Sequence, residues 1–192
     1  AEIINLIDSS LSKVTKNKTL IKINDLNLFN KLVDSLKLPI RWKLRLKRHF
    51  WRKEYFNDLL FRLETGSDLK KNIFELDKKS YLKMKKLNKN HKIAGRKISE
   101  IIKRFEKKIN EPRSNIDGKN ISRIIKEYLS INCQFKNAKS TLLKFELKNK
   151  LDLKLDRIDL FALDIKNKEV IFSTKIGRKI EYYNGLVFEI YK

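Results

Sequence analysis

Apolar residues recur at helical spacing along most of the first 130 positions of the chain. The stretch DLNLFNKLVDSLKL, residues 25–38, has the clearest stripe of this kind; it starts at the potential capping residues Asn24 and Asp25, and Pro39 follows it. Further helices are predicted over residues 54–66, 68–89, 91–109 and 121–130, with a turn-rich break at 110–120. The first part of the chain is therefore predicted to be mostly helical.

The pattern changes after residue 140. Strand-like segments follow one another there: TLLKFEL (141–147), IDLFALDI (158–165), EVIFS (169–173) and GLVFEIYK (185–192), the last preceded by the turn dipeptide Asn184-Gly185. Helices followed by strands predict an α+β fold with a three- to four-stranded mixed or antiparallel sheet. We expect two domains, a basic helical extension over residues 1–92 and a small α+β domain over residues 93–192.

Residues 41–53, RWKLRLKRHFWRK, fit two kinds of backbone. In a helix, Trp42, Leu46 and Phe50 would lie on one side, at positions i, i+4 and i+8. In a strand, Trp42, Leu44 and Leu46 would face away from the Lys and Arg side chains. Either geometry buries an aromatic and aliphatic face and presents a cationic one.

The net charge of the chain indicates what kind of partner residues 41–53 contact. The chain has 46 Lys and Arg against 23 Asp and Glu, a net charge of +23, and residues 1–110 hold 29 of the basic residues but 12 of the acidic ones. Such a charge repels itself and favours a polyanionic partner, most often nucleic acid. The predicted nucleic-acid contacts are Arg41, Lys43, Arg45, Lys47, Arg48, Arg52, Lys53, Arg96 and Lys97. A membrane-surface or calmodulin-target helix has the same composition, and a solvated face without a partner is a third interpretation.

Several classes of site find little support in the sequence. The single cysteine, Cys133, excludes a disulfide framework, and His49 and His91 lie far apart in the chain, which speaks against a His/Cys metal site. Glycine is scarce at five residues, and no Gly-rich phosphate loop occurs. No apolar run is long enough to span a bilayer, and residues 1–13 do not resemble a secretory signal. We expect no cofactor, no metal, no membrane partner and no enzymatic activity.

One stretch supports an alternative function. In KFELKNKLDLKLD, residues 144–156, Glu146 and Lys148 form an E-x-K on the predicted strand, and Asp152 and Asp156 follow. Such groups can hold Mg²⁺ and polarise a phosphodiester, although the usual metal-binding Asp precedes the E-x-K. The alternative is therefore a Mg²⁺-dependent nuclease or a DNA-binding protein of an AT-rich mobile element. An amphipathic strand with a charged face explains the same residues.

From about residue 93 onward, the chain resembles the C-terminal domain of the small-subunit ribosomal protein S three family. Two basic helices, a turn with Ala138 and Lys139 that opens a strand, a Leu-rich strand and a final strand follow in that order over about 100 residues; the matching terminal residues are Gly185, Ile190, Tyr191 and Lys192. The resemblance implies that Arg123 and Lys126 lie near the messenger RNA entry. The G-x-x-G loop of the family's KH domain does not occur here.

A second segment, IGRKIEYYNG at residues 176–185, is similar to ribosomal protein S nineteen. Both resemblances imply a structural constituent of the small ribosomal subunit, in its head region. The excess of Lys, Ile and Asn indicates an AT-rich coding genome, so a mitochondrial ribosome is expected. The implied partners are ribosomal RNA, other small-subunit ribosomal proteins and messenger RNA near its entry.

Overall fold

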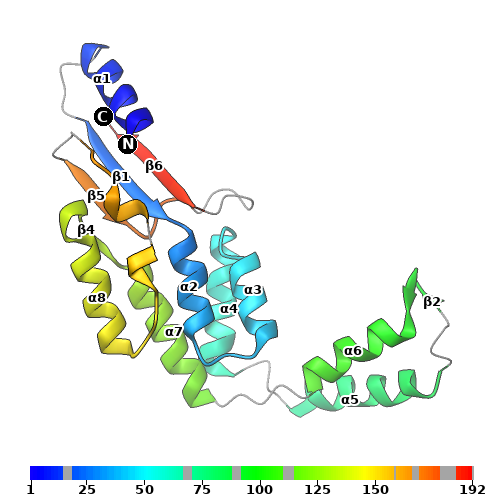
Figure 1. Ribbon diagram of the computed structural model, residues 1–192. Coiled ribbons are helices and arrows are strands. Elements are labelled where there is room, and N and C mark those ends of the chain that lie inside the picture. Colours follow the sequence, from blue (N-terminus) through cyan, green and yellow to red (C-terminus); the bar gives the residue numbers. More distant parts are fainter. Residues whose placement is uncertain are drawn as a thin grey trace.

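The computed structural model describes residues 1–14, 19–66, 71–87, 92–109, 115–157, 159–165, 169–177 and 185–191. The fold is α+β, as predicted, with helices, a four-stranded mixed sheet and a second sheet of two short strands (Figure 1). The helices are α1 (Glu2–Val14), α2 (Asn27–Ser35), α3 (Ile40–Arg48), α4 (Lys53–Thr65), α5 (Lys71–Lys85), α6 (Ile98–Ile109), α7 (Asn115–Leu129) and α8 (Ala138–Asn149). The strands are β1 (Leu20–Asp25), β2 (Lys92–Ile93), β3 (Arg96–Lys97), β4 (Asn132–Gln134), β5 (Val170–Ser173) and β6 (Leu186–Tyr191), and the 3₁₀ helices are η2 (Phe135–Asn137), η3 (Leu155–Arg157) and η4 (Asp159–Ala162).

The larger sheet is built around β1. Its strand order is β4-β5-β1-β6, in which β1 runs parallel to β5 and antiparallel to β6, and β4 runs antiparallel to β5. A central strand near the beginning of the chain therefore pairs on both sides with strands from its last part.

One face of this sheet is apolar because the strand registers align the same kind of residue. Ile23 lies opposite Phe172 on β5 and Phe188 on β6, and Phe172 lies opposite Cys133 on β4. Ile23 and Phe172 are fully buried, and Cys133 and Phe188 pack against the same core. Alternation along each strand places these side chains on one face, where they form the floor of the core.

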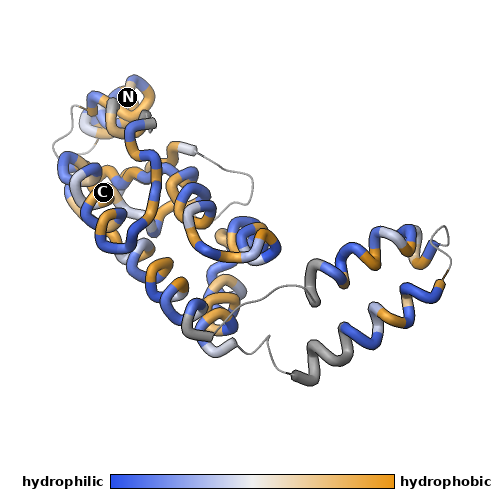
Figure 2. The backbone as a smooth tube through the Cα atoms, turned by 60° about the horizontal axis from the view of Figure 1, so that its bottom comes forward, coloured by the Kyte–Doolittle hydropathy of each residue, from blue (hydrophilic) through white to orange (hydrophobic). Residues whose placement is uncertain are grey.

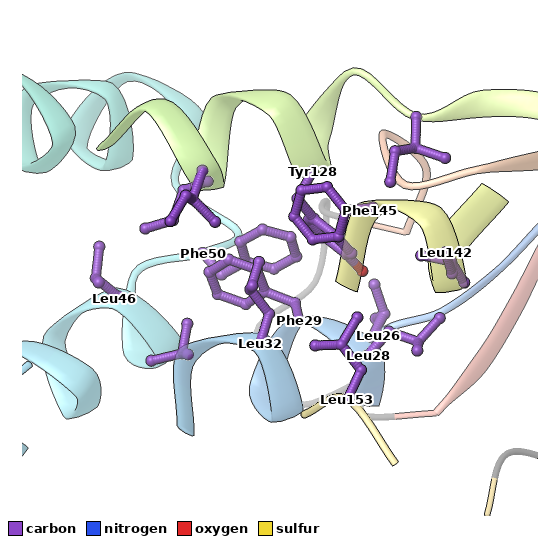
Figure 3. Close-up of a cluster of buried hydrophobic side chains, with 14 of the residues drawn as sticks. Leu26, Leu28, Phe29, Leu32, Leu46, Phe50, Tyr128, Leu142, Phe145 and Leu153 are labelled. Carbon is purple, nitrogen blue, oxygen red and sulfur yellow. The ribbon is translucent and has the colours of Figure 1, made fainter. Parts of the chain in front are cut away.

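Aromatic side chains join the helices that pack around the core (Figure 3). Phe29 of α2 stacks on Phe50, which follows α3, with ring centroids 3.7 Å apart. Both rings meet Phe56 of α4 edge-on, and Phe29 also contacts Tyr128 of α7. Tyr128 in turn contacts Phe145 of α8. Edge-on and offset aromatic pairs add about 0.5–1.5 kcal/mol each beyond the area that they bury, so this chain of rings fixes how α2, α4, α7 and α8 pack.

Helices α5 and α6 form an antiparallel pair that projects from the rest of the molecule (Figures 1 and 2). Tyr81 of α5 donates a hydrogen bond to Glu106 of α6 at 3.2 Å, and Ile98 at the start of α6 is fully buried. The pair thus has its own small seam, and the strands β2 and β3 lie at its far end.

Most of the predicted elements are confirmed. Helices lie in each of the predicted regions, and α4 ends where the sequence indicates, at Gly66 with a left-handed φ of 62°. Residues 92–97, which belong to the helix predicted over 91–109, instead form the hairpin of β2 and β3. Glycine is favoured there because a side chain destabilises that backbone conformation. The predicted strands at residues 169–173 and 185–192 appear as β5 and β6. Cys133 is partly buried.

Two predicted strands are wrong. Residues 141–147 lie in the helix α8, because Ala138, Leu142 and Phe145 form a helical stripe that is buried against α7 and the sheet, whereas Leu143 and Leu147 are exposed. The alternation of apolar and polar residues that predicted a strand included leucines that are exposed in the structure. The described part of residues 158–165 contains the 3₁₀ helix η4 in place of a strand, and its Leu160 is anchored in the core.

Two further elements differ from the sequence expectation. The strand β1 was not predicted, although Ile21 and Ile23 alternate with Lys22 and are fully buried. Helix α7 begins at Asn115, within the predicted turn-rich stretch.

One prediction is not tested by the structure, and a second concerns residues outside the described ranges. The division of the chain into residues 1–92 and 93–192 stays a prediction; buried side chains of both segments contribute to one hydrophobic cluster. The segment similar to ribosomal protein S nineteen lies mostly at residues 178–184, outside the described residues, and so does Asn184 of the predicted turn.

The central position of β1 predicts a strong effect of Ile23→Ala. We expect this change to lower the free energy of unfolding by about 2–5 kcal/mol, because Ile23 is fully buried and its truncation leaves a cavity in the core. Lys22→Ala is the control on the same strand; it removes a cation–π contact of Lys22 with the Tyr191 ring, and we expect less than about 1 kcal/mol. Urea denaturation of the two variants measures both effects, and equal losses would contradict the position given to β1.

Candidate basic binding surface

The basic stretch at residues 41–53 adopts the helical alternative over Ile40–Arg48. Pro39 precedes the helix, and its carbonyl accepts hydrogen bonds from the backbone N–H groups of Trp42 and Lys43, at 2.9 and 3.2 Å. Trp42, Leu46 and Phe50 are buried, as the helical spacing predicts. The tryptophan is therefore an anchor in the core.

Several basic side chains of α3 are held by the protein itself. Lys47 forms an ion pair with Asp34 of α2 at 2.7 Å, and Lys43 donates to the Asp34 carbonyl at 2.6 Å. The guanidinium of Arg45 lies 5.0 Å from the centre of the Trp42 ring and donates to the hydroxyl of Tyr55 at 3.3 Å. These contacts fasten α3 to α2 and α4, and they reduce the charge that is available to a partner.

The outer face of α3 has a different character. Ile40 and Leu44, four residues apart, are 61% and 59% exposed, and Arg48 continues the same face one turn further. Beyond the helix, Arg52 stacks on the ring of Trp51 at 4.6 Å, and Lys53 is exposed at the start of α4. We call Ile40, Leu44 and Arg48 the outer α3 face; it combines two exposed apolar side chains with a cation, and Arg52 and Lys53 are exposed just after the helix.

The two predicted contacts Arg96 and Lys97 lie on β3, after a tight hairpin turn. Ala94 and Gly95 both have positive φ, 48° and 78°, which is the backbone of a two-residue turn that suits paired strands. The turn pairs Arg96 with Ile93, so that both line a cleft of about 570 Å³. Its other lining residues are Arg41, Ala94, Ile101, Arg104 and Phe105.

Three guanidinium groups and no carboxylate are found among the described lining residues of this cleft. Arg41 comes from α3, Arg96 from β3 and Arg104 from α6, and the apolar part of the wall is half-buried Ile93, Ile101 and Phe105. Arg104 and Phe105 were not predicted as site residues. Their signal in the sequence is the spacing i, i+3 and i+4 from Ile101, which places all three on one face of α6.

The predicted contacts on α7 are bound within the protein. Lys126 donates to the carboxylate of Glu64 at 2.6 Å, which links α7 to α4. Arg123 and Lys148 both donate to the carboxylate of Glu127, at 2.9 and 2.7 Å, so that α7 is tied to α8. The hydrogen bond from Lys126 holds the pKa of Glu64 below its ordinary value, and the hydrogen bond from Lys148, with the charge of Arg123, does the same for Glu127.

The E-x-K at Glu146 and Lys148 lies on a helix rather than on the predicted strand. The Glu146 carboxylate accepts a hydrogen bond from the backbone N–H of Leu153, which fastens the segment after α8, and Lys148 is engaged by Glu127. Within the described ranges there is no group of three or more His, Cys, Asp or Glu residues that could hold a metal ion. The described helices include none with the length and apolar character needed to cross a membrane.

Comparison with known proteins changes the interpretation of the sequence. The chain is 26% identical, over 204 aligned positions, to an ATP phosphoribosyltransferase regulatory subunit of Rhizobium rhizogenes. The alignment covers 94% of this chain and 53% of that protein, so the chain spans about half the length of the curated relative that it matches. No protein-family model matches the chain, and no solved structure matches it significantly.

This similarity overturns the ribosomal interpretation. It extends over nearly the whole chain, and the relative is named as a regulatory subunit of an enzyme, not as ribosomal protein S three or S nineteen. The expected structural role in the small ribosomal subunit is therefore wrong, and so are the expected partners, ribosomal RNA, ribosomal proteins and messenger RNA. The nuclease and DNA-binding alternative is not supported either. The mitochondrial location stays a prediction.

Acid titration should reveal the ion pairs of Glu127. Because the pKa of Glu127 is lowered in the folded state, its contribution to stability is present above the ordinary value of 4.5 and is lost as the pH falls through the folded pKa. We expect the free energy of unfolding to fall more steeply between about pH 5 and pH 3 in the wild type than in Glu127→Gln. Urea denaturation across this range measures the slopes.

The matched variant for this titration is Lys148→Gln, which keeps the Glu127 carboxylate and removes the group that lowers its pKa most. Its slope should be smaller than that of the wild type. An unchanged slope in Glu127→Gln would show that the ion pairs of Arg123 and Lys148 with Glu127 do not stabilise the fold.

Proposed function

We propose that this chain is a non-catalytic regulatory protein that binds an enzyme of the phosphoribosyltransferase kind through the outer α3 face. The observation that carries the proposal is the extent of the similarity, which covers 94% of the chain and therefore nearly all of its helices and strands. The relative is named as a regulatory subunit of ATP phosphoribosyltransferase, and the partner proposed for this chain is the corresponding catalytic subunit.

The outer α3 face has the chemistry of a protein-binding surface. A single exposed apolar residue is common on any protein, but Ile40 and Leu44 are adjacent on one face of a helix whose opposite face is fully buried. Protein interfaces concentrate apolar side chains and arginine at their centre and place other polar groups around them. Ile40 and Leu44 would supply that centre, with Arg48 beside them.

Charge specifies the kind of partner surface. The net charge of +23 and the exposed cations Arg48, Arg52 and Lys53 favour an acidic face on the enzyme. Complementary charge of this type accelerates association and excludes wrong partners more than it adds affinity. The affinity itself would come from burying Ile40 and Leu44.

The outer α3 face is already positioned for such contact in the isolated chain. The buried Trp42 and Leu46 anchor α3, and the ion pair between Lys47 and Asp34 fixes it against α2. A rigid helix loses little conformational entropy when it is bound, so less of the interaction free energy is spent on ordering.

Leu44→Glu tests this proposal. We expect the wild-type chain to form a complex with the ATP phosphoribosyltransferase catalytic subunit of the same organism and to change its catalytic rate. The variant should bind at least about tenfold more weakly, because a carboxylate replaces an apolar side chain at the interface centre and faces an acidic partner. Isothermal titration calorimetry measures the affinity, and an assay of phosphoribosyl transfer measures the regulation.

The control is Leu147→Glu, which makes the same change at a 76% exposed leucine of α8. Both substitutions affect exposed side chains, so neither should change the free energy of unfolding by more than about 0.5 kcal/mol. Absence of a complex with the wild-type chain would refute the proposed function. Equal weakening by the two variants would refute the assignment of the outer α3 face.

A further inference from the structure

The cleft between α3 and the α5–α6 pair has the composition of a ligand site. Its volume of about 570 Å³ is in the range of pockets that hold a small organic molecule. Arg41, Arg96 and Arg104 reach it from three different elements, while Ile93, Ile101 and Phe105 form an apolar wall. We propose that this cleft binds a nucleotide, whose phosphates contact the arginines and whose base lies against Phe105 and Ile101.

The arginines define the charged part of the ligand. A guanidinium presents a planar fork of N–H donors that matches a phosphate group and stays charged at any physiological pH. Arg96 and Arg104 are exposed and both line the cleft, Arg96 from β3 and Arg104 from α6, which begins directly after β3, so both can contact one ligand. Without a carboxylate among the described lining residues, the cleft favours an anion.

The apolar wall defines the rest of the ligand. An inorganic phosphate would leave Ile101 and Phe105 in contact with water, whereas the flat ring of a base can stack on the phenyl ring. The two residues lie four apart on α6, on the same face as Arg104. A phosphate and a base joined by a sugar would therefore find both kinds of contact along one helix.

The inference goes beyond the proposed function and does not depend on it. Arg41 belongs to α3, so the cleft adjoins the outer α3 face, yet the residues to be tested, Arg96 and Arg104, lie on β3 and α6. A variant that loses nucleotide binding but still forms the enzyme complex would have a defect in the cleft alone. A variant that loses the enzyme complex but still binds the nucleotide would have a defect in the outer α3 face alone.

The test is binding of ATP and of inorganic pyrophosphate to the full chain, measured by isothermal titration calorimetry in about 150 mM KCl, where long-range attraction by the net charge is screened. We expect Arg96→Gln/Arg104→Gln to weaken ATP binding at least about tenfold, because two charge-assisted contacts are lost. Both side chains are exposed, so the variant should keep the circular dichroism spectrum of the wild type.

The matched control is Lys97→Gln/Lys103→Gln, which removes the same charge from neighbouring positions of β3 and α6 that do not line the cleft. It should change the affinity for ATP by less than about twofold. Equal weakening in both double variants would mean attraction to the overall positive charge and would overturn the site. So would a lack of ATP binding by the wild type. Tighter binding of ATP than of pyrophosphate supports a contact to the base, and equal affinity would overturn the nucleotide assignment.

Discussion

The pairing of β1 with β5 and β6 is the constraint on which the rest of this structure depends. Three residues of β1 pair with a parallel strand on one side, all six pair with an antiparallel strand on the other, and the inward side chains Ile21 and Ile23 are fully buried. Helix α2 begins two residues after β1, so the sheet sets where α2 starts. The aromatic contacts of Phe29 then position the turn after α3, and with it the outer α3 face and one wall of the cleft.

The sequence was most informative where local signals and burial agree. The stripes of α2 and α6, the left-handed Gly66 at the end of α4, and the strands β5 and β6 are all visible in residue patterns. Helix α8 was misread because Leu143 and Leu147 are apolar but exposed, so the count of apolar residues did not report which side is buried. The short strand β1 was missed because its stability comes from partners distant in sequence, which no local pattern contains.

The candidate site was only partly readable for a similar reason. A sequence shows how many cations a segment has but not which of them are held by carboxylates elsewhere in the fold. Lys47 and Lys126 are occupied by Asp34 and Glu64, which lie on other helices. The cleft arginines Arg41 and Arg104 are more than sixty positions apart in the sequence, so their convergence is a property of the tertiary structure.

The long separation between β1 and its partners also has a consequence for biosynthesis. Ile21 pairs with Val170, about 150 residues later, and with Ile190 after that. During translation, β1 leaves the ribosome long before β5 and β6 are synthesised. Its two hydrogen-bonding edges therefore have no partner, and its two isoleucines are exposed, while most of the chain is made. Sheets closed by such distant contacts fold slowly and expose strand edges to other molecules in the meantime. The charged Lys22 between the two isoleucines is then a safeguard during synthesis, because a cation within an unpaired strand discourages its pairing with a second copy.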